Sequence, residues 1–165
     1  MVKPPIPDDE AQRQAAVDRL HGVAPGTHAA WQDIVHLASL ICETPTALVT
    51  VIDGQRQWFI SSVGAPPDEG TRDAAFCAHA ILEPDMPMVV PDAREDPVLS
   101  DYHSVVAEGV RFYAGVPINL DTQPLGTLCV IDERPRDLSD EQLASLQLLA
   151  RIAERQLACE LRKRN

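Results

Sequence analysis

Residues 110–132, VRFYAGVPINLDTQPLGTLCVID, decide the fold expected for this chain. Two apolar runs, Val110–Leu120 and Leu125–Asp132, are separated by the turn-forming segment Asp121–Pro124. Apolar runs of this length, joined by a short polar turn, are typical of a β-hairpin. We therefore predict two neighbouring antiparallel strands in the last third of the chain.

A second hairpin is predicted earlier in the sequence. The run Ala47–Ile52 leads into Asp53-Gly54, a pair of residues that tolerates the positive φ of tight hairpin turns. The chain then returns as Gln55–Ser62, and Pro87–Val90 adds a brief strand. The strands are therefore expected to pair in an antiparallel sheet.

Helices are predicted on both sides of these strands. A short polar helix spans Asp8–Leu20, and a second helix begins near Thr27 and ends before Pro45, because the residue before a proline avoids helical angles. The last helix begins at Ser139, and Gln142 three residues later completes a capping box. Helices that flank paired strands indicate an α+β fold. The second helix carries one apolar stripe, made by Trp31, Ile34, Val35, Ala38, Ile41 and Cys42.

The remaining segments are expected to be short or irregular. Asp73–Leu82 suits a short helix, and the polar stretch Asp92–Val106 suits a loop with one helical turn. Residues 1–7 contain three prolines and are expected to form a loose tail. The Gly- and Pro-containing stretches 21–26 and 64–70 are expected to be loops.

Composition narrows the possible function. The 165 residues suit one domain, and the net charge of −11 argues against a nucleic-acid partner, whose phosphates require a basic face. No apolar run reaches the roughly 20 residues of a membrane span, and the first residues lack the apolar stretch of a secretory signal. We expect a cytoplasmic protein without a membrane partner. Its four cysteines form no CxxC pair and are expected to be free thiols.

Five blocks of the sequence stand out, in the order RQWFISSVG (56–64), FCAHAIL (76–82), MVVPDAREDP (88–97), VRFYAGVPI (110–118) and GTLCVIDERPR (126–136). Together they resemble bacterial GAF domains of the kind attached to histidine kinases and cyclic-di-GMP enzymes. The resemblance runs from Trp31 to Leu161, and we expect residues 1–26 to be a tail and short helix, 27–161 the GAF domain and 162–165 a basic tail.

The resemblance implies a GAF-like, PAS-related architecture. Its central antiparallel sheet has five or six strands, with the N- and C-terminal helices on one face, often joined to a second subunit as a homodimer. Loops and short helices on the other face usually hold a ligand pocket. The Asn-Lys-Xn-Phe-X3-Asp-Glu signature of cyclic-nucleotide-binding GAF domains is absent, and Ala78 separates Cys77 from His79, unlike the Cys-His pair that anchors a bilin in phytochromes.

Phe76, Cys77 and His79 form the most suggestive cluster. Residues two apart on a helix do not face each other, so Cys77 and His79 are poorly placed as a nucleophile–base pair. A thiol near a helix N-terminus can still be reactive. Two interpretations remain open: these residues line a ligand site, or Phe76 and Cys77 pack beneath the sheet while His79 bonds to a loop carbonyl.

A second set of candidate residues follows in the sequence. Asp92, Arg94 and Arg111 are candidates for a polar pocket in which arginine grips a carboxylate or phosphate, or for a loop held by ion pairs alone. Tyr102, with His103, and Tyr113 would add contacts for an aromatic or anionic ligand. Strand alternation places Arg111 and Tyr113 on one face and Phe112 on the other. If Phe112 faces the terminal helices, Arg111 and Tyr113 face the pocket side.

We therefore expect a sensory or regulatory domain that binds an unidentified small molecule and acts through its terminal helices, with a homodimer or a separate signalling partner as the output. No catalytic residue, metal or cofactor is predicted. Two alternatives are a thiol-based redox enzyme that uses Cys77, with a resolving thiol nearby, and a ligand-free interaction module.

Overall fold

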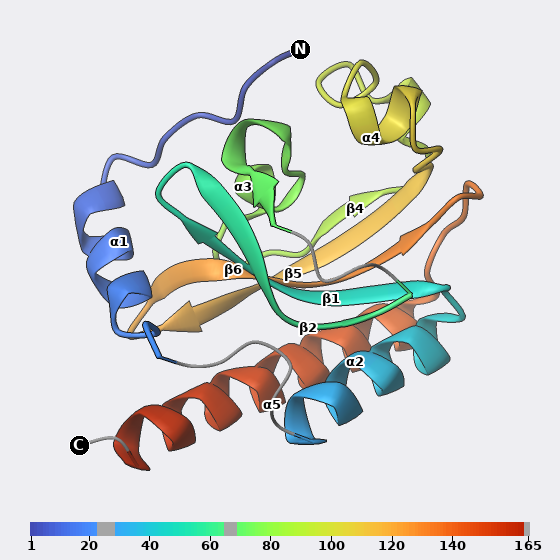
Figure 1. Ribbon diagram of the computed structural model, residues 1–165. Coiled ribbons are helices and arrows are strands. Elements are labelled where there is room, and N and C mark those ends of the chain that lie inside the picture. The colour runs from blue at the N-terminus through green and yellow to red at the C-terminus, as the bar shows by residue number, and fades with distance from the viewer. Residues whose placement is uncertain (23–28, 65–68, 164–165) are drawn as a thin grey trace.

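The computed structural model describes residues 1–22, 29–64 and 69–163, and it contains one antiparallel sheet of six strands in the order β3-β2-β1-β6-β5-β4 (Figure 1). The predicted α+β fold and its sheet of five or six strands are confirmed. The strands are β1 (Thr46–Asp53), β2 (Arg56–Val63), β3 (Gly70–Thr71), β4 (Met88–Val90), β5 (Phe112–Leu120) and β6 (Gln123–Asp132).

Helices cover both faces of this sheet. The long helices α2 (Ala29–Cys42) and α5 (Asp140–Lys163) lie side by side on one face, whereas the four-residue helices α3 (Cys77–Ala80) and α4 (His103–Val106) lie on the other (Figure 1). Helix α1 (Glu10–Asp18) packs at one end of the sheet. Within the described ranges, no helix is long and apolar enough to cross a membrane.

Two hydrophobic cores follow from the alternation of side chains along the strands. Phe112 is buried in the core beneath α2 and α5, while its neighbour Tyr113 is buried in the core beneath α3. In β1, Val49 and Val51 join the first core, and Leu48 joins the second. The expected orientation of Phe112 and Tyr113 is confirmed, because successive residues of a strand point to opposite faces.

Both hairpin turns differ from the predicted ones: the second is shorter, and the first is shifted by one residue. In the β5–β6 hairpin, Leu120 pairs with Gln123, so only Asp121 and Thr122 form the turn, both with positive φ. Gln123 and Pro124, which were predicted in the turn, therefore belong to β6. In the first hairpin, Asp53 pairs with Arg56, so the turn is Gly54–Gln55 and not Asp53-Gly54, with φ of +60° at Gly54.

The predicted helix Asp73–Leu82 is wrong in length. The segment forms a 3-10 turn, η1 (Arg72–Ala74), then an extended Ala75, and then α3. Arg72 is 1% exposed, and its guanidinium donates to Glu10 Oε1 and to the Gly54 carbonyl. This link to α1 fixes the segment before α3, so the helix begins only at Cys77.

The expectation of a loose tail at residues 1–7 is also wrong. This segment, the N-terminal strap, runs from α1 across the side of the molecule that carries α3 and α4 (Figure 1). Pro4 is buried, the Val2 carbonyl accepts from Tyr102 Oη at 2.6 Å, and Lys3 Nζ lies 3.0 Å from Asp73 Oδ2. These polar contacts hold the segment in place, whereas its proline content alone gave no sign that it would be ordered.

Other predicted boundaries agree with the structure or lie beyond it. The capping box is confirmed, since Gln142 N donates to Ser139 Oγ and Ser139 N donates to Gln142 Oε1. The predicted helix start near Thr27 and the predicted break at 23–26 lie outside the described residues. Helix α5 continues through Lys163, so the first half of the expected tail 162–165 is helical.

Candidate functional site

The candidate site is a cavity of about 280 Å³ on the face of the sheet opposite α2 and α5. Strands β1, β2, β5 and β6 form its floor, and the chain around β3, α3 and α4 forms its walls and mouth. The described residues that line it are Leu48, Gln57, Phe59, Gly70, Thr71, Ala74, Ala75, Phe76, Cys77, His103, Ser104, Glu108, Val110, Tyr113, Cys129 and Ile131.

Buried aromatic and hydroxyl groups hold Cys77 in the wall of this cavity. Tyr113 Oη donates to Cys77 Sγ at 3.3 Å, and Thr127 Oγ1 donates to the same sulfur at 3.1 Å. The rings of Phe76 and Tyr113 meet edge to face, with centroids 5.3 Å apart. Tyr113 fits because Gly115, two residues along the same face, has no side chain.

The surroundings of Cys77 change its acidity. Burial by itself disfavours the thiolate, but hydrogen bonds from Cys129, Thr127, Thr50 and Tyr113 outweigh burial and lower the pKa of the Cys77 thiol. The hydrogen bond with Cys77, together with burial, raises the pKa of Cys129.

Three of the eight residues proposed from sequence, Phe76, Cys77 and Tyr113, line the cavity. His79 and Tyr102 pair with each other outside it. Tyr102 donates its hydroxyl proton to the Val2 carbonyl, so the 2.6 Å contact between His79 Nε2 and Tyr102 Oη is donated by the imidazole. The expected bond from His79 to a loop carbonyl is therefore replaced by a bond to a side chain.

The charged residues proposed from sequence make local contacts instead. Arg94 is paired with Asp92, with Nη2 and Oδ2 2.6 Å apart, and Asp92 Oδ1 caps the 3-10 turn η2 (Ala93–Glu95). Arg111 precedes β5 and donates to the carbonyls of Val105 and Val110. The hydrogen bond from Arg94 lowers the pKa of Asp92, and the charge of Arg111 adds a smaller contribution. These bonds are those of a loop held by local contacts, and the interpretation of the three residues as a site for a carboxylate or phosphate stays a prediction.

Sequence reasoning missed most of the floor and the mouth. Ile131 is paired in register with Tyr113, and Cys129 with Gly115, so the predicted β5–β6 hairpin already contained the signal for both. Leu48 and Phe59 come from the other hairpin, whose position relative to β6 no local pattern specifies. Glu108 lies at the mouth, between the predicted loop Asp92–Val106 and the strand predicted from Val110, where no pattern marked it.

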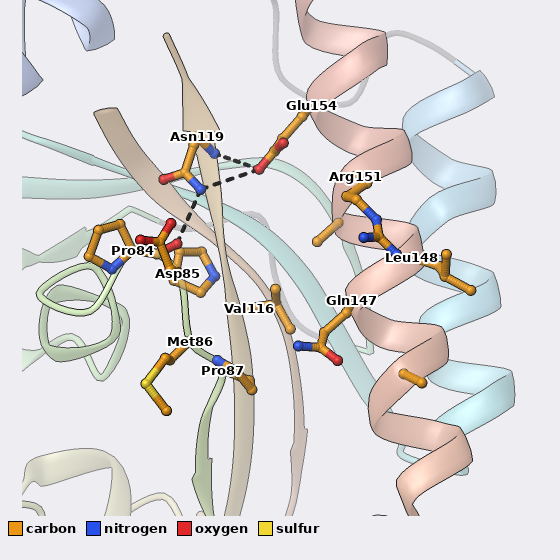
Figure 2. Close-up of a pocket in the computed structure, with 13 residues that line it drawn as sticks. Pro84, Asp85, Met86, Pro87, Val116, Asn119, Gln147, Leu148, Arg151 and Glu154 are labelled. Carbon is orange, nitrogen blue, oxygen red and sulfur yellow. Dashed lines mark hydrogen bonds between the residues drawn. The ribbon is translucent and has the colours of Figure 1, made fainter. Parts of the chain in front are cut away.

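A second hollow lies between α5 and the loop that precedes β4 (Figure 2). This groove of about 500 Å³ is open to solvent, and Figure 2 shows Glu154 of α5 turned toward Asn119 of β5. Glu154 Oε1 accepts from Asn119 N at 2.9 Å, and Asn119 Nδ2 donates to the Pro84 carbonyl. These bonds hold the end of β5 against α5. We therefore interpret the groove as the place where helix and sheet pack together, and not as a ligand site.

Asp53 has a structural role. Its carboxylate lies near the side chains of Asp18 and His21, and among the described residues these three form one group whose spacing could hold a metal ion. The Asp53 carboxylate accepts from Gln14 Nε2 at 2.8 Å and from Trp58 Nε1 at 3.2 Å. These bonds tie α1 to the first hairpin.

The sequence matches the GAF domain family over residues 26–157, and the chain belongs to this family. It is 40% identical over 155 residues to a cyclic di-GMP phosphodiesterase of Pseudomonas aeruginosa, a match that covers 92% of this chain. The chain spans 26%, about a quarter, of that relative's length.

Solved structures share the fold at lower identity. The chromophore-binding domain of a bacteriophytochrome from R. palustris superposes with a TM-score of 0.66 at 16% identity, covering 98% of this chain and 65% of that chain. A domain of a putative two-component sensor histidine kinase from Sinorhizobium meliloti 1021 gives 0.64 at 15% identity, covering 86% and 100%. A type II free methionine-R-sulfoxide reductase from Thermoplasma acidophilum gives 0.60 at 17%, covering 76% and 89%.

Proposed function

We propose that this GAF domain is a sensory module that binds a small molecule in the cavity beneath α3 and α4 and passes the signal on through α2 and α5. The observation that carries the proposal is the cavity itself, walled by Phe76, Cys77 and Tyr113. Concave, largely apolar sites with a few polar groups are typical of small-molecule binding.

The sheet supplies a physical route from the cavity to the long helices. Tyr113 faces the cavity, and its neighbour Phe112 is buried against the core of α2 and α5. A ligand that moved β5 would therefore change the packing of both helices. A ligand shifts such an equilibrium only by its difference in affinity for the two arrangements.

We propose that the signal is passed on through a homodimer in which α2 and α5 of the two copies pack together. Four apolar side chains, Leu37 and Leu40 of α2 and Leu148 and Ile152 of α5, are between 45% and 73% exposed. Contiguous exposed apolar surface is typical of an interface. We expect Ile152→Arg to shift a dimer to monomer in sedimentation velocity, whereas Val106→Arg, on the opposite face in α4, leaves the dimer intact. A wild-type protein that remains monomeric at high concentration would contradict the proposed homodimer.

A blocked cavity tests ligand binding. Ser104 of α4 lines the cavity, whereas Val106 of the same helix is exposed and does not line it. Native mass spectrometry of protein purified gently from its source cells, and thermal shifts across a metabolite panel, should show a bound small molecule in wild type and Val106→Trp. Ser104→Trp should lose it. A wild-type protein without adduct or thermal shift would favour the ligand-free interaction module.

A second candidate, thiol redox chemistry, is favoured by the contact between Cys77 and Cys129. With hydrogen peroxide as oxidant, the Cys77 thiolate would attack one peroxide oxygen and release hydroxide, which becomes water. The Cys129 thiol would then attack the resulting sulfenic acid, forming a disulfide and a second water. Peroxide should remove two free thiols in wild type and in Cys42→Ser, but leave a trappable sulfenic acid in Cys129→Ser. Unchanged thiol counts would exclude this chemistry.

A further inference from the structure

The size of the cavity limits its occupant. Its volume of about 280 Å³ lies at the lower end of ligand pockets, which span roughly 300–1,000 Å³. Such a space encloses one ring or two fused rings. A dinucleotide or a tetrapyrrole would have to leave most of its surface outside.

The shape and chemistry of the walls favour a flat ring. Three aromatic side chains surround the space: Phe59 of β2, Tyr113 of β5 and Phe76, which directly precedes α3. The apolar floor is completed by Leu48 and Ile131. Aromatic rings pack against one another in edge-to-face and offset arrangements, as Phe76 and Tyr113 already do. An aromatic ligand would extend this arrangement.

The charges around the cavity favour a neutral or positive ligand. Among the described residues that line it, the charged group is the carboxylate of Glu108, which lies at the mouth 3.9 Å from His103 Nε2, and none is a lysine or arginine. Arg111 follows the lining residue Val110 in sequence, but its guanidinium donates to backbone carbonyls. A buried anion without a cation or sufficient donors carries a large desolvation cost.

We propose that the cavity binds a small, flat aromatic molecule that is neutral or positively charged, with Glu108 selecting against anions at the mouth. This inference rests on the proposed function and adds the ligand class. It separates the two possibilities that sequence reasoning left open, an aromatic or an anionic ligand, in favour of the first.

Three probes with one shared ring test the charge preference: indole (neutral), tryptamine (cationic) and indole-3-acetate (anionic). Each is titrated at pH 8 while the amide resonances of Cys77 and Tyr113 are followed by NMR. We expect indole and tryptamine to shift both resonances, and indole-3-acetate to bind at least about tenfold more weakly than tryptamine, a difference of about 1.4 kcal/mol.

A matched pair of charge variants isolates the contribution of Glu108. Glu108→Gln should reduce the affinity ratio of tryptamine to indole-3-acetate by about two- to fivefold, the usual effect of an exposed ion pair. Glu95→Gln makes the same change in net charge away from the cavity and should leave the ratio unchanged. The affinity for indole should be the same in both variants and in wild type.

The possible failures are distinguishable. If indole-3-acetate binds as tightly as tryptamine and Ser104→Trp abolishes both, the charge preference is wrong and the sensory function stands. If no probe shifts the two resonances but another panel compound does, the ligand class is wrong and the sensory function again stands. If neither the probes nor the panel shift them, and native mass spectrometry finds no adduct, both proposals are overturned.

Discussion

At the scale of single residues, Gly115 shapes the candidate site by the side chain that it lacks. A Cβ at this position would lie 2.1 Å from Tyr113 Oη, which is held by its bond to the buried Cys77. We expect Gly115→Ala to lower the free energy of unfolding by about 1–3 kcal/mol, as overpacking does, measured by urea denaturation.

The control for this prediction is Gly70→Ala. A Cβ at position 70 comes no closer than 3.4 Å to Gln57 Oε1, the far end of a flexible side chain. Its effect should stay within about 0.5 kcal/mol, as for most surface substitutions. Equal effects of the two substitutions would show that Tyr113 does not lie over Gly115.

Glu10 makes stability depend on pH. Burial by itself raises the pKa of Glu10, but hydrogen bonds and charges of Arg13 and Arg72 outweigh burial and lower the pKa from 4.5 to about 2. A carboxyl group with a lowered folded-state pKa stabilises the fold fully above its unfolded-state pKa, and this contribution is lost as pH falls toward the folded value. The stabilisation by Glu10 is therefore lost between about pH 4.5 and 2.

Glu10→Gln tests this linkage. Because glutamine does not titrate, the variant should be less stable than wild type at pH 6, and the difference should shrink as pH falls to about 2. Denaturant unfolding at a series of pH values measures this difference. A difference that stays constant from pH 6 to pH 2 would mean that Glu10 is not stabilised as an anion.

At the scale of elements, the start of α5 is a direct consequence of local sequence. Ser139 and Gln142 exchange side-chain-to-backbone bonds at 3.1 and 2.9 Å. We expect Ser139→Ala to lower the free energy of unfolding by about 0.5–2 kcal/mol. Ser145→Ala, in the interior of the same helix, should be neutral or slightly stabilising, because alanine favours helices. Similar losses for both variants, measured by thermal unfolding, would contradict a capping role.

The elements that sequence predicted well are the long ones. The strands β5 and β6 and the helices α2 and α5 carry periodic patterns over eight residues or more, and each pattern is satisfied within its own segment. Helix α3 has four residues, too few to be stable alone. Its start at Cys77 depends on Arg72, whose partners Glu10 and Gly54 are distant in sequence.

At the scale of the whole molecule, the N-terminal strap connects the first residues to the site face. Tyr102, which is fully buried, bonds both Val2 and His79 through one hydroxyl group. Removal of this group takes one hydrogen bond from the Val2 carbonyl and one from His79 Nε2, and neither partner residue is fully buried, so Tyr102→Phe should cost about 0.5–1.5 kcal/mol of unfolding free energy.

Limited proteolysis and hydrogen exchange locate this effect. Tyr102→Phe should speed cleavage within residues 1–7 and amide exchange around His79. Lys3→Ala removes only an exposed ion pair with Asp73 and should cost at most about 1 kcal/mol. Cleavage within residues 1–7 that is equally fast in wild type and Tyr102→Phe would show that the strap is not bound in solution.

The sequence by itself determined the α+β fold, the family and the faces of the strands, because periodicity and turn chemistry act over a few neighbouring residues. It therefore placed Phe112 and Tyr113 on opposite faces of β5, and the structure places Phe112 in the core of the long helices and Tyr113 in the core beneath α3. The tertiary structure alone decided which distant segments meet there. Leu48, Phe76 and Glu108 surround one cavity because the sheet and its short helices bring them together, and such long-range packing leaves no repeating signal along the chain.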